Sequence, residues 1–169
     1  MAGFAKLTPA FTVLVPIAPP RQAGVLSTGP PLTHVEILGG QKGITSEVDY
    51  PIALDATWVH GADYIKADPD GKHARLEVDS VVEDTSTGGL VRFRYTGVVD
   101  MAGPAGKVLR GESDAATTEF GDIFTHAKFE TGHPSLKALE NKVYVGSGRF
   151  VLEAGKPVVV EYKISEITG

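Results

Sequence analysis

The segment ARLEVDSVVEDTSTGGLVRFRYTGVVD, residues 74–100, carries the clearest secondary-structure pattern of the chain. Apolar and polar residues alternate over 74–84 and again over 90–100, which is the period of a β-strand with one buried face. The TSTGG segment between the two runs contains two glycines and has the length of a hairpin loop. Residues 74–100 are therefore predicted to form an antiparallel hairpin.

Strand-like segments continue on both sides of this hairpin. They are residues 11–18, 33–39, 43–50 and 53–60 before it, and residues 126–132, 142–152 and 157–167 after it. One short helix is predicted at PSLKALEN, residues 134–141, where proline occupies a permitted first-turn position. The Pro-rich segments 18–24 and 28–33 are predicted to be loops, because proline lacks an amide donor and restricts the residue before it.

About eight or nine short strands with one short helix indicate an all-β fold, either an antiparallel barrel or a sandwich. We favour a single antiparallel β-barrel, because closure removes the edge strands that so few helices would leave unprotected. The 169 residues fit one domain, over 1–169. The 20 glycines and 11 prolines agree with many short elements joined by turns.

Composition and charge exclude several classes of function. The chain has no cysteine, which excludes disulfides, Cys-ligated zinc, iron–sulfur clusters and thiol catalysis. The net charge is −5 and basic residues do not cluster, so nucleic acid is not an expected partner. The longest apolar run, residues 11–18, is interrupted by Pro16 and falls short of the roughly 20 residues that span a membrane. We expect a soluble, cytoplasmic protein without a membrane partner.

The motifs of nucleotide and metal chemistry are missing from the sequence. It contains neither GxGxxG nor GxxxxGK[ST], so no cofactor of that kind is expected. The 5 histidines show no HxH or HExxH spacing, and no metal site is expected. The GSG at 146–148 lacks the GxSxG form of a nucleophile elbow. Any catalysis would rest on carboxylate, imidazole, phenol and amide groups.

One segment concentrates polar chemistry. WVHGADY, residues 58–64, carries an indole, an imidazole, a carboxylate and a phenol. On a bend, His60 and Asp63 would bring a base and an acid to the same barrel mouth, where a small-molecule site is expected. The alternative is an ordinary turn, because Gly-Ala-Asp is a good turn sequence.

The charged residues of the 74–100 hairpin leave two interpretations open. Arg75, Glu77 and Asp79 share one face of its first strand, and Arg92 and Arg94 share one face of its second. These side chains either face solvent or line the wet interior of a ligand-holding barrel. We favour the solvent-facing interpretation, in which opposite charges pair across the strands.

Three segments, HGADYIKADPDGKHARLEVD (60–79), FETGHPSLKALENKVYVGSG (129–148) and VVVEYKISEI (158–167), resemble the domain-of-unknown-function family 3237. The spacing between them is also similar, so the resemblance covers most of residues 10–167. It implies a single small antiparallel barrel, lipocalin-like or allene-oxide-cyclase-like. Similar barrels serve as cyclases, isomerases and pericyclic catalysts, or as ligand carriers. The matching motif positions are Gly61, Asp63, Tyr64, Glu130, Gly132 and Asn141.

The chain also departs from that family at two places. Ser80 and Val81 stand where the family usually has an arginine–tyrosine pair, and Ala138 stands where it has a tryptophan. If those residues contribute to catalysis in relatives, the resemblance implies a different substrate or chemistry for this chain.

We expect a cofactor-independent enzyme of secondary metabolism, a cyclase, isomerase or lyase, that acts on a hydrophobic small molecule in a barrel pocket. Its predicted catalytic groups are Asp63 or Glu130 as a carboxylate of raised pKa, His60 as the partner acid or base, and Asn141 as a donor to a carbonyl. The predicted substrate contacts are Trp58, Tyr64, Glu77, Phe93, Arg94, Tyr95 and Tyr144. The alternative is a non-catalytic carrier barrel, and a homo-oligomeric module ranks third.

Overall fold

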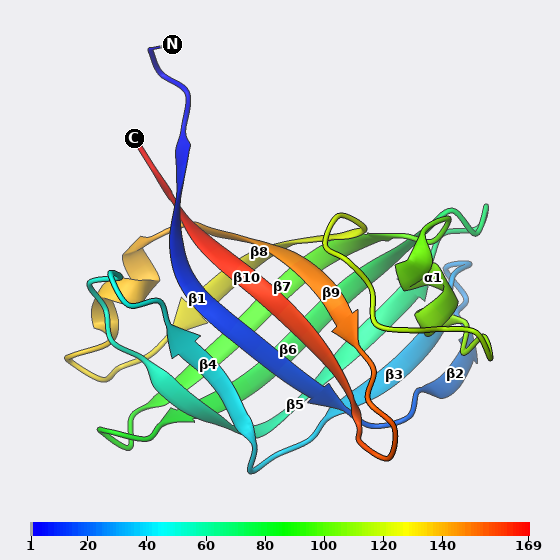
Figure 1. The fold of residues 1–169 in the computed structure, drawn as a ribbon, viewed down its shortest axis with the longest axis horizontal. Helices are drawn as coiled ribbons and strands as arrows, with labels where there is room; N and C mark the ends of the chain where they lie inside the picture. Colours follow the sequence, from blue (N-terminus) through cyan, green and yellow to red (C-terminus); the bar gives the residue numbers. More distant parts are fainter. Residues whose placement is uncertain (1) are drawn as a thin grey trace.

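The computed structural model describes residues 2–169, which form ten β-strands, one α-helix and one 3-10 helix (Figure 1). The strands are β1 (Lys6–Ile17), β2 (Arg21–Val25), β3 (Pro31–Ile37), β4 (Lys42–Ser46), β5 (Asp55–Ala67), β6 (His73–Asp84), β7 (Leu90–Asp100), β8 (Ile123–Glu130), β9 (Tyr144–Val151) and β10 (Val158–Thr168). The helices are α1 (Pro104–Leu109) and the 3-10 helix η1 (Lys137–Asn141). Neither helix is long and apolar enough to cross a membrane.

Eight strands close an antiparallel barrel and two further strands extend it, which confirms the predicted fold class. From β5 to β10 each strand pairs with the next along the chain, and β1 pairs with β10 to close the sheet. β3 and β4 both pair with β5, β3 along the Gly61–Lys66 part and β4 along the Asp55–Thr57 part. β2 pairs with β3. Pairing of β1 with β10 removes the two open edges that the sheet would otherwise expose, which the few helices could not cover.

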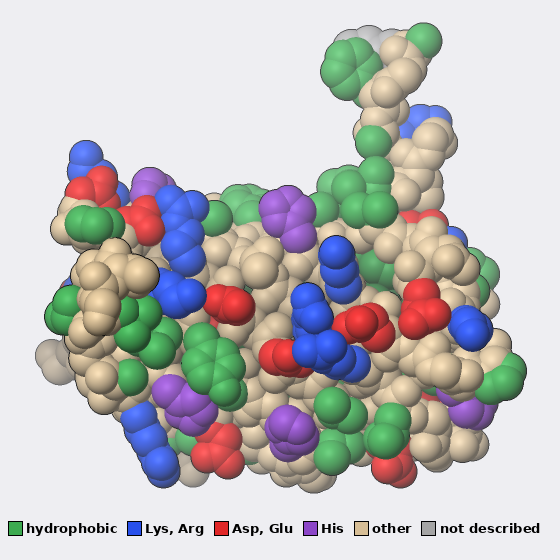
Figure 2. Space-filling view, turned by 180° about the vertical axis from the view of Figure 1, so that it is seen from behind, with side chains coloured by type: hydrophobic (Ala, Val, Ile, Leu, Met, Phe, Trp, Pro, Cys, Tyr) green, Lys and Arg blue, Asp and Glu red, His purple; other side chains and the backbone are tan. Residues whose placement is uncertain are grey.

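Alternation along the strands separates a buried inner face from a charged outer face. In β6, Leu76 and Val78 are buried, whereas Arg75, Glu77 and Asp79 are exposed. The outer charges pair with opposite ones, and Figure 2 shows basic and acidic side chains interspersed over the wall seen from behind. The solvent-facing interpretation of this charged ladder is therefore confirmed.

The segment 58–64 is not a bend at the rim but the middle of β5. Gly61 allows a close approach to β6, since a Cβ added there would lie 2.4 Å from the Cβ of Ser80. A β-bulge between Trp58 and His60 shifts the alternation by one residue. As a result His60 points outward although Trp58 is buried, and Asp63 points inward.

Three smaller elements also differ from the sequence-based expectation. The Pro-rich segment 18–24 is not a loop throughout, because Arg21–Val25 forms the exposed strand β2. This strand pairs with β3 outside the closed barrel and therefore needs no apolar face. The short helix α1 has no counterpart among the predicted elements. The helix expected over 134–141 begins only at Lys137 and is a 3-10 helix.

The two ends of the barrel are covered in different ways (Figure 1). At one end, η1 contributes the buried Leu139, and the rings of Phe11, Phe129 and Tyr144 pack together with centroids 5.0–5.8 Å apart. At the other end lies α1. We call these the η1 end and the α1 end. Aromatic side chains fill the η1 end, and an interior cavity lies toward the α1 end.

Candidate functional site

A cavity of about 570 Å³ lies inside the barrel at the α1 end. Apolar side chains from many strands form its wall: Val15, Ile17, Val35, Ile37, Ile65, Leu76, Val99, Ile123, Phe150 and Val160. Val108 and Leu109 of α1, with Pro19 and Pro20, line its mouth. A concave apolar cavity of this size is the usual form of a small-molecule site.

Three polar side chains reach this cavity from the inner faces of different strands, namely Asp63 from β5, Tyr95 from β7 and Tyr162 from β10. Asp63 pairs with Val78, and Val78 pairs with Tyr95, so the two residues lie in register two strands apart, both on the inner face. The rings of Tyr95 and Tyr162 meet edge to face with centroids 5.1 Å apart. One carboxyl group and two phenols therefore face the same apolar space.

The environment of Asp63 favours its neutral form. Only 9% of the residue is exposed, and no cationic side chain forms an ion pair with it within residues 2–169. Burial raises the pKa of Asp63 to about 7, and the negative charge of Glu77 adds to this shift. The backbone N–H of Glu77, which donates to Oδ1 at 3.0 Å, and that of Tyr64 oppose it. A carboxyl group with such a pKa can both accept and donate a proton at neutral pH.

Both phenols of the cavity remain protonated. Burial raises the pKa of Tyr95 well above its usual value, and the nearby Tyr162 and Asp63 raise it further. Burial raises the pKa of Tyr162 as well, as does the charge of Asp63, whereas its hydrogen bond with Tyr95 lowers it. The site thus combines one proton acceptor with a hydrogen-bonded pair of phenols, of which one O–H stays free to donate, in apolar surroundings where such a donor acts most strongly on developing charge.

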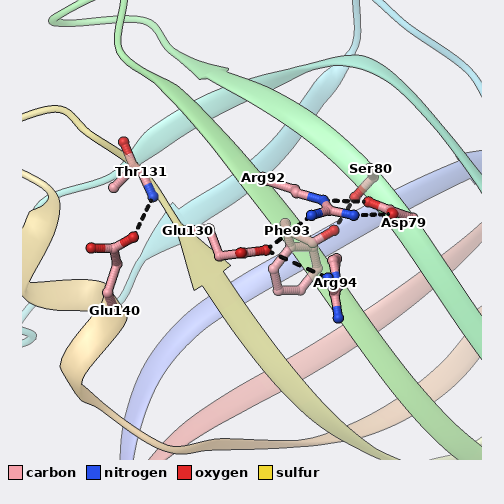
Figure 3. Close-up of polar contacts among 8 residues, drawn as sticks. All are labelled: Asp79, Ser80, Arg92, Phe93, Arg94, Glu130, Thr131 and Glu140. Atoms are coloured by element: carbon pink, nitrogen blue, oxygen red, sulfur yellow. Dashed lines mark hydrogen bonds and ion pairs between the residues drawn. The ribbon is translucent and has the colours of Figure 1, made fainter.

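Of the four predicted catalytic residues, only Asp63 faces the cavity. His60 is exposed on the outer wall because of the bulge in β5, and Asn141 is exposed at the end of η1. Figure 3 shows the carboxylate of Glu130 on the outer wall, where it pairs with Arg92 at 3.4 Å and Arg94 at 3.7 Å. The predicted convergence of these groups on one pocket is therefore wrong for His60, Glu130 and Asn141.

Three of the predicted substrate contacts belong to the apolar core below the cavity. Trp58 is 1% exposed, and its Nε1 donates a hydrogen bond to the carbonyl oxygen of Leu14 at 2.7 Å. Phe93 is fully buried beside it, with the ring centroids 6.3 Å apart. Tyr144 is buried at the η1 end. All three follow the inward positions of their strands, but the cavity begins beyond them.

Three other predicted substrate contacts lie on the outer wall, and the remaining one lines the interior cavity. Glu77 pairs with Lys66 at 3.2 Å, Arg94 pairs with Glu130, and Tyr64 is 41% exposed. Tyr95 is the predicted contact that lines the cavity. Period-two alternation explains the division, because Tyr95 has the buried phase of its strand and the other three have the exposed phase.

Tyr162 is a polar residue of the cavity that is not among the predicted substrate contacts. In β10, Val160, Tyr162 and Ile164 are buried at alternating positions. The same alternation in VVVEYKISEI is visible in the sequence and places the phenol on the inner face.

A second buried polar cluster lies at the η1 end, and all of its members have partners. The hydroxyl of Tyr50 donates to Oε2 of Glu166 at 2.6 Å and lies 2.9 Å from the hydroxyl of Tyr144. Lys142 donates to Oε1 of Glu166 at 2.7 Å. Buried polar groups that are satisfied in this way stabilise a fold. This cluster therefore secures the η1 end, whereas the carboxyl group of Asp63 has no cationic partner among the described residues.

A larger hollow of about 740 Å³ lies on the outer wall, across β5 to β10. Glu77 and His126 on its surface are exposed, and Glu77 already pairs with Lys66. Solvated and paired charges gain little from binding a ligand, because water already stabilises them. The interior cavity is the better candidate site although its volume is smaller.

Fold and cavity together define a class of protein: a small closed antiparallel β-barrel with an apolar interior pocket and a few inward polar groups. The family DUF3237, whose description is "protein of unknown function", matches residues 5–167, so the chain belongs to this family. The resemblance seen in the sequence is thereby confirmed. No curated protein is similar enough to the chain to count as a match.

Solved structures of three other proteins share the fold. A conserved protein of unknown function from Rhodopseudomonas palustris is 22% identical, with a TM-score of 0.75 over 99% of this chain and 100% of its own. A β-barrel-like protein from Acinetobacter baumannii is 22% identical, with a TM-score of 0.70 over 99% of both chains. A protein with unknown function from Clostridium acetobutylicum is 14% identical, with a TM-score of 0.69 over 98% of this chain and 99% of its own. At these identities the similarity shows the fold alone.

Proposed function

We propose that the protein is a cofactor-independent enzyme that moves a proton on a hydrophobic small molecule inside the barrel, as a cyclase, isomerase or lyase. The observation that carries this proposal is Asp63, a buried carboxyl group without a cationic partner among the described residues, in a cavity that is otherwise mostly apolar. Burying such a group costs folding free energy. Strongly perturbed carboxyl groups in clefts gather at functional sites, which supports a chemical role.

Each polar group has a distinct role in this proposal. Asp63 takes a proton from the substrate and returns it at another position, for which a pKa near 7 is well suited. One phenol of the hydrogen-bonded pair Tyr95 and Tyr162 donates to the oxygen on which negative charge develops, and the other donates to that phenol. The apolar wall holds the substrate and excludes water, which strengthens these interactions.

A carrier barrel without turnover is the second candidate function. The mostly apolar wall favours it, because such a wall binds a ligand without needing any chemistry. The two candidates differ in what Asp63 does: a carrier keeps its function when the carboxyl group is replaced, and an enzyme does not. For either candidate we place the protein in the cytoplasm, since a chain without cysteine needs no oxidising compartment.

The substitution Val99→Trp tests the cavity as the binding site. Val99 is buried and lines the cavity, so an indole at this position occupies the space that a ligand needs. We expect the affinity for the neutral apolar probe N-phenyl-1-naphthylamine, measured by fluorescence, to fall at least ~10-fold, which is about 1.4 kcal/mol.

The neighbouring residue offers a matched control. Val98 is 37% exposed on the outer face of the same strand, and Val98→Trp is expected to bind the probe like the wild type. Circular dichroism checks that both variants are folded, and Ile123→Phe is a milder change in the same cavity. Equal probe affinity in all three variants and the wild type would show that ligands bind elsewhere.

A further inference from the structure

We infer that the substrate is an apolar carbonyl compound with a removable C–H next to its carbonyl group, and that the reaction passes through an enolate held among Asp63, Tyr95 and Tyr162. This inference rests on the proposed function and adds the class of substrate and of intermediate. It follows from which groups line the cavity, from how they are placed, and from what each can do with a proton.

The charges around the cavity exclude a substrate whose inner end is already an anion. No arginine or histidine of the described residues lines the cavity. Its one lysine, Lys156, is exposed at the mouth and pairs with Glu153, and its second carboxylate, Glu112, pairs with Arg110. At the inner end, a carboxylate or phosphate of the substrate would lose its hydration in apolar surroundings and meet no cation that compensates for the loss. The inner end of the substrate is therefore neutral when it binds.

The two phenols suit a substrate that carries an oxygen on which negative charge develops during the reaction. Tyr95 and Tyr162 are both buried and line the cavity, their rings meet edge to face with centroids 5.1 Å apart, and their hydroxyl groups hydrogen-bond each other. One O–H of the pair is therefore left to donate to a ligand. A phenol that stays protonated donates a hydrogen bond, and that bond strengthens as its acceptor gains charge. A carbonyl oxygen that turns into an enolate oxygen is such an acceptor.

The carboxyl group is held in place to act beside these donors. Oδ1 of Asp63 accepts the backbone N–H of Glu77 at 3.0 Å, which fixes the orientation of the group while it still lines the cavity. The strand register places Asp63 and Tyr95 opposite the same residue, Val78, on its two sides, and both line the cavity. A bound carbonyl compound can thus present its oxygen to the phenols and its neighbouring C–H to the carboxylate.

The reaction balances without any further reactant. The carboxylate of Asp63 takes the proton, the C–H bond breaks, and its electron pair forms the carbon–carbon double bond of the enolate while the negative charge moves to oxygen. The free O–H of the phenol pair donates to that oxygen. The neutral carboxylic acid then returns the proton to a carbon of the conjugated system, which regenerates the carboxylate and releases an isomer.

Naphthalene derivatives test this inference on the full chain. 2-Naphthol resembles a dienol, and its fluorescence reports whether it is ionised, whereas naphthalene has the same apolar rings without the oxygen. We expect 2-naphthol to bind at least ~10-fold more tightly than naphthalene. In Asp63→Asn, whose amide mimics the protonated acid, 2-naphthol should bind more tightly still and a larger fraction should be ionised.

The phenols have a matched set of variants. Tyr95→Phe and Tyr162→Phe should each weaken 2-naphthol binding ~10-fold and leave naphthalene binding unchanged, and unchanged naphthalene binding shows that the variant is folded. Tyr64→Phe removes the same hydroxyl from the outer wall, and Glu130→Gln alters an outer carboxylate. Both controls should bind both compounds like the wild type.

The outcomes separate this inference from the proposed function. If naphthalene binds but 2-naphthol binds no more tightly, and the Tyr→Phe variants do not change its affinity, the inferred enolate intermediate is wrong. The cavity then remains a site for apolar molecules. If 2-naphthylmethylamine binds best and Asp63→Asn abolishes its binding, the cavity takes cations and the inference is also overturned. If none of these compounds binds, the proposed function fails together with the inference.

Discussion

Asp63→Asn is expected to raise the free energy of unfolding by about 4 kcal/mol above pH 7 and to change it little below pH 4. An aspartate side chain in water has a pKa of 3.8, whereas burial in the folded barrel penalises the charge of Asp63 and raises its pKa to about 7. Each pKa unit corresponds to about 1.4 kcal/mol, and this difference therefore gives the expected magnitude. An asparagine of nearly the same shape removes the penalty.

The sign of the pH dependence follows from the raised pKa. Because the folded chain binds this proton more tightly than the unfolded chain, the contribution of Asp63 is most favourable below pH 4. It decreases as the pH rises from about 4 to about 7 and is constant above. The difference in stability between Asp63→Asn and the wild type should therefore grow over that interval when denaturant unfolding is measured at a series of pH values.

The difference in unfolding free energy between variant and wild type at each pH cancels the contributions of all other titrating groups. The exposed Asp49 provides a matched control, because Asp49→Asn makes the same chemical change in solvent and should alter stability by less than about 0.5 kcal/mol. A difference for Asp63→Asn that stays the same from about pH 4 to about pH 8 would mean that the carboxyl group is not desolvated. Under the proposed function the stabilised variant is also inactive, a trade-off typical of active-site groups.

Trp58→Ala is expected to lower the free energy of unfolding by about 3–5 kcal/mol. Trp58 fills the core with 1% of its surface exposed, and Gly43 packs so closely that an added Cβ would lie 2.8 Å from the indole Nε1. Truncation leaves a void and deprives the carbonyl of Leu14 of its hydrogen-bond donor. Denaturant unfolding measures the loss, and Trp58→Phe should lie between the alanine variant and the wild type.

The same variant also separates a core role from the sequence-based prediction that Trp58 contacts the substrate. Because Trp58 does not line the cavity, folded Trp58→Ala and Trp58→Phe should bind N-phenyl-1-naphthylamine with the affinity of the wild type. If Trp58→Ala lowered the free energy of unfolding by less than about 1 kcal/mol and also abolished probe binding, the indole would belong to the binding site instead.

Most of the barrel could be predicted from the sequence because its signal is repeated along the chain. Period-two alternation in residues 74–84 and 90–100 corresponds to β6 and β7, and the closing segment 157–167 corresponds to β10. β2 and α1 were missed for physical reasons. β2 lies outside the closed barrel and has no buried face, and α1 has only six residues, too few for a helical period.

The candidate site could be predicted only in part, because a single bulge changes which residues face inward. Strict alternation from the buried Trp58 would place His60 inside, and the bulge after Trp58 places Asp63 there instead. No local composition marks that bulge. Glu130 is different, since it follows the buried Phe129 and alternation alone places it outside, as the structure does. Applied strictly, the same rule finds Tyr162.

The central claim is that Asp63 is a desolvated carboxyl group in the barrel cavity, poised to exchange protons at neutral pH. A titration of its side-chain carboxyl carbon by 13C nuclear magnetic resonance, with Asp63→Asn to assign the signal, measures its pKa directly. We expect a midpoint at about 7, since burial desolvates the carboxyl group. A midpoint near the ordinary aspartate value of about 4 would contradict it.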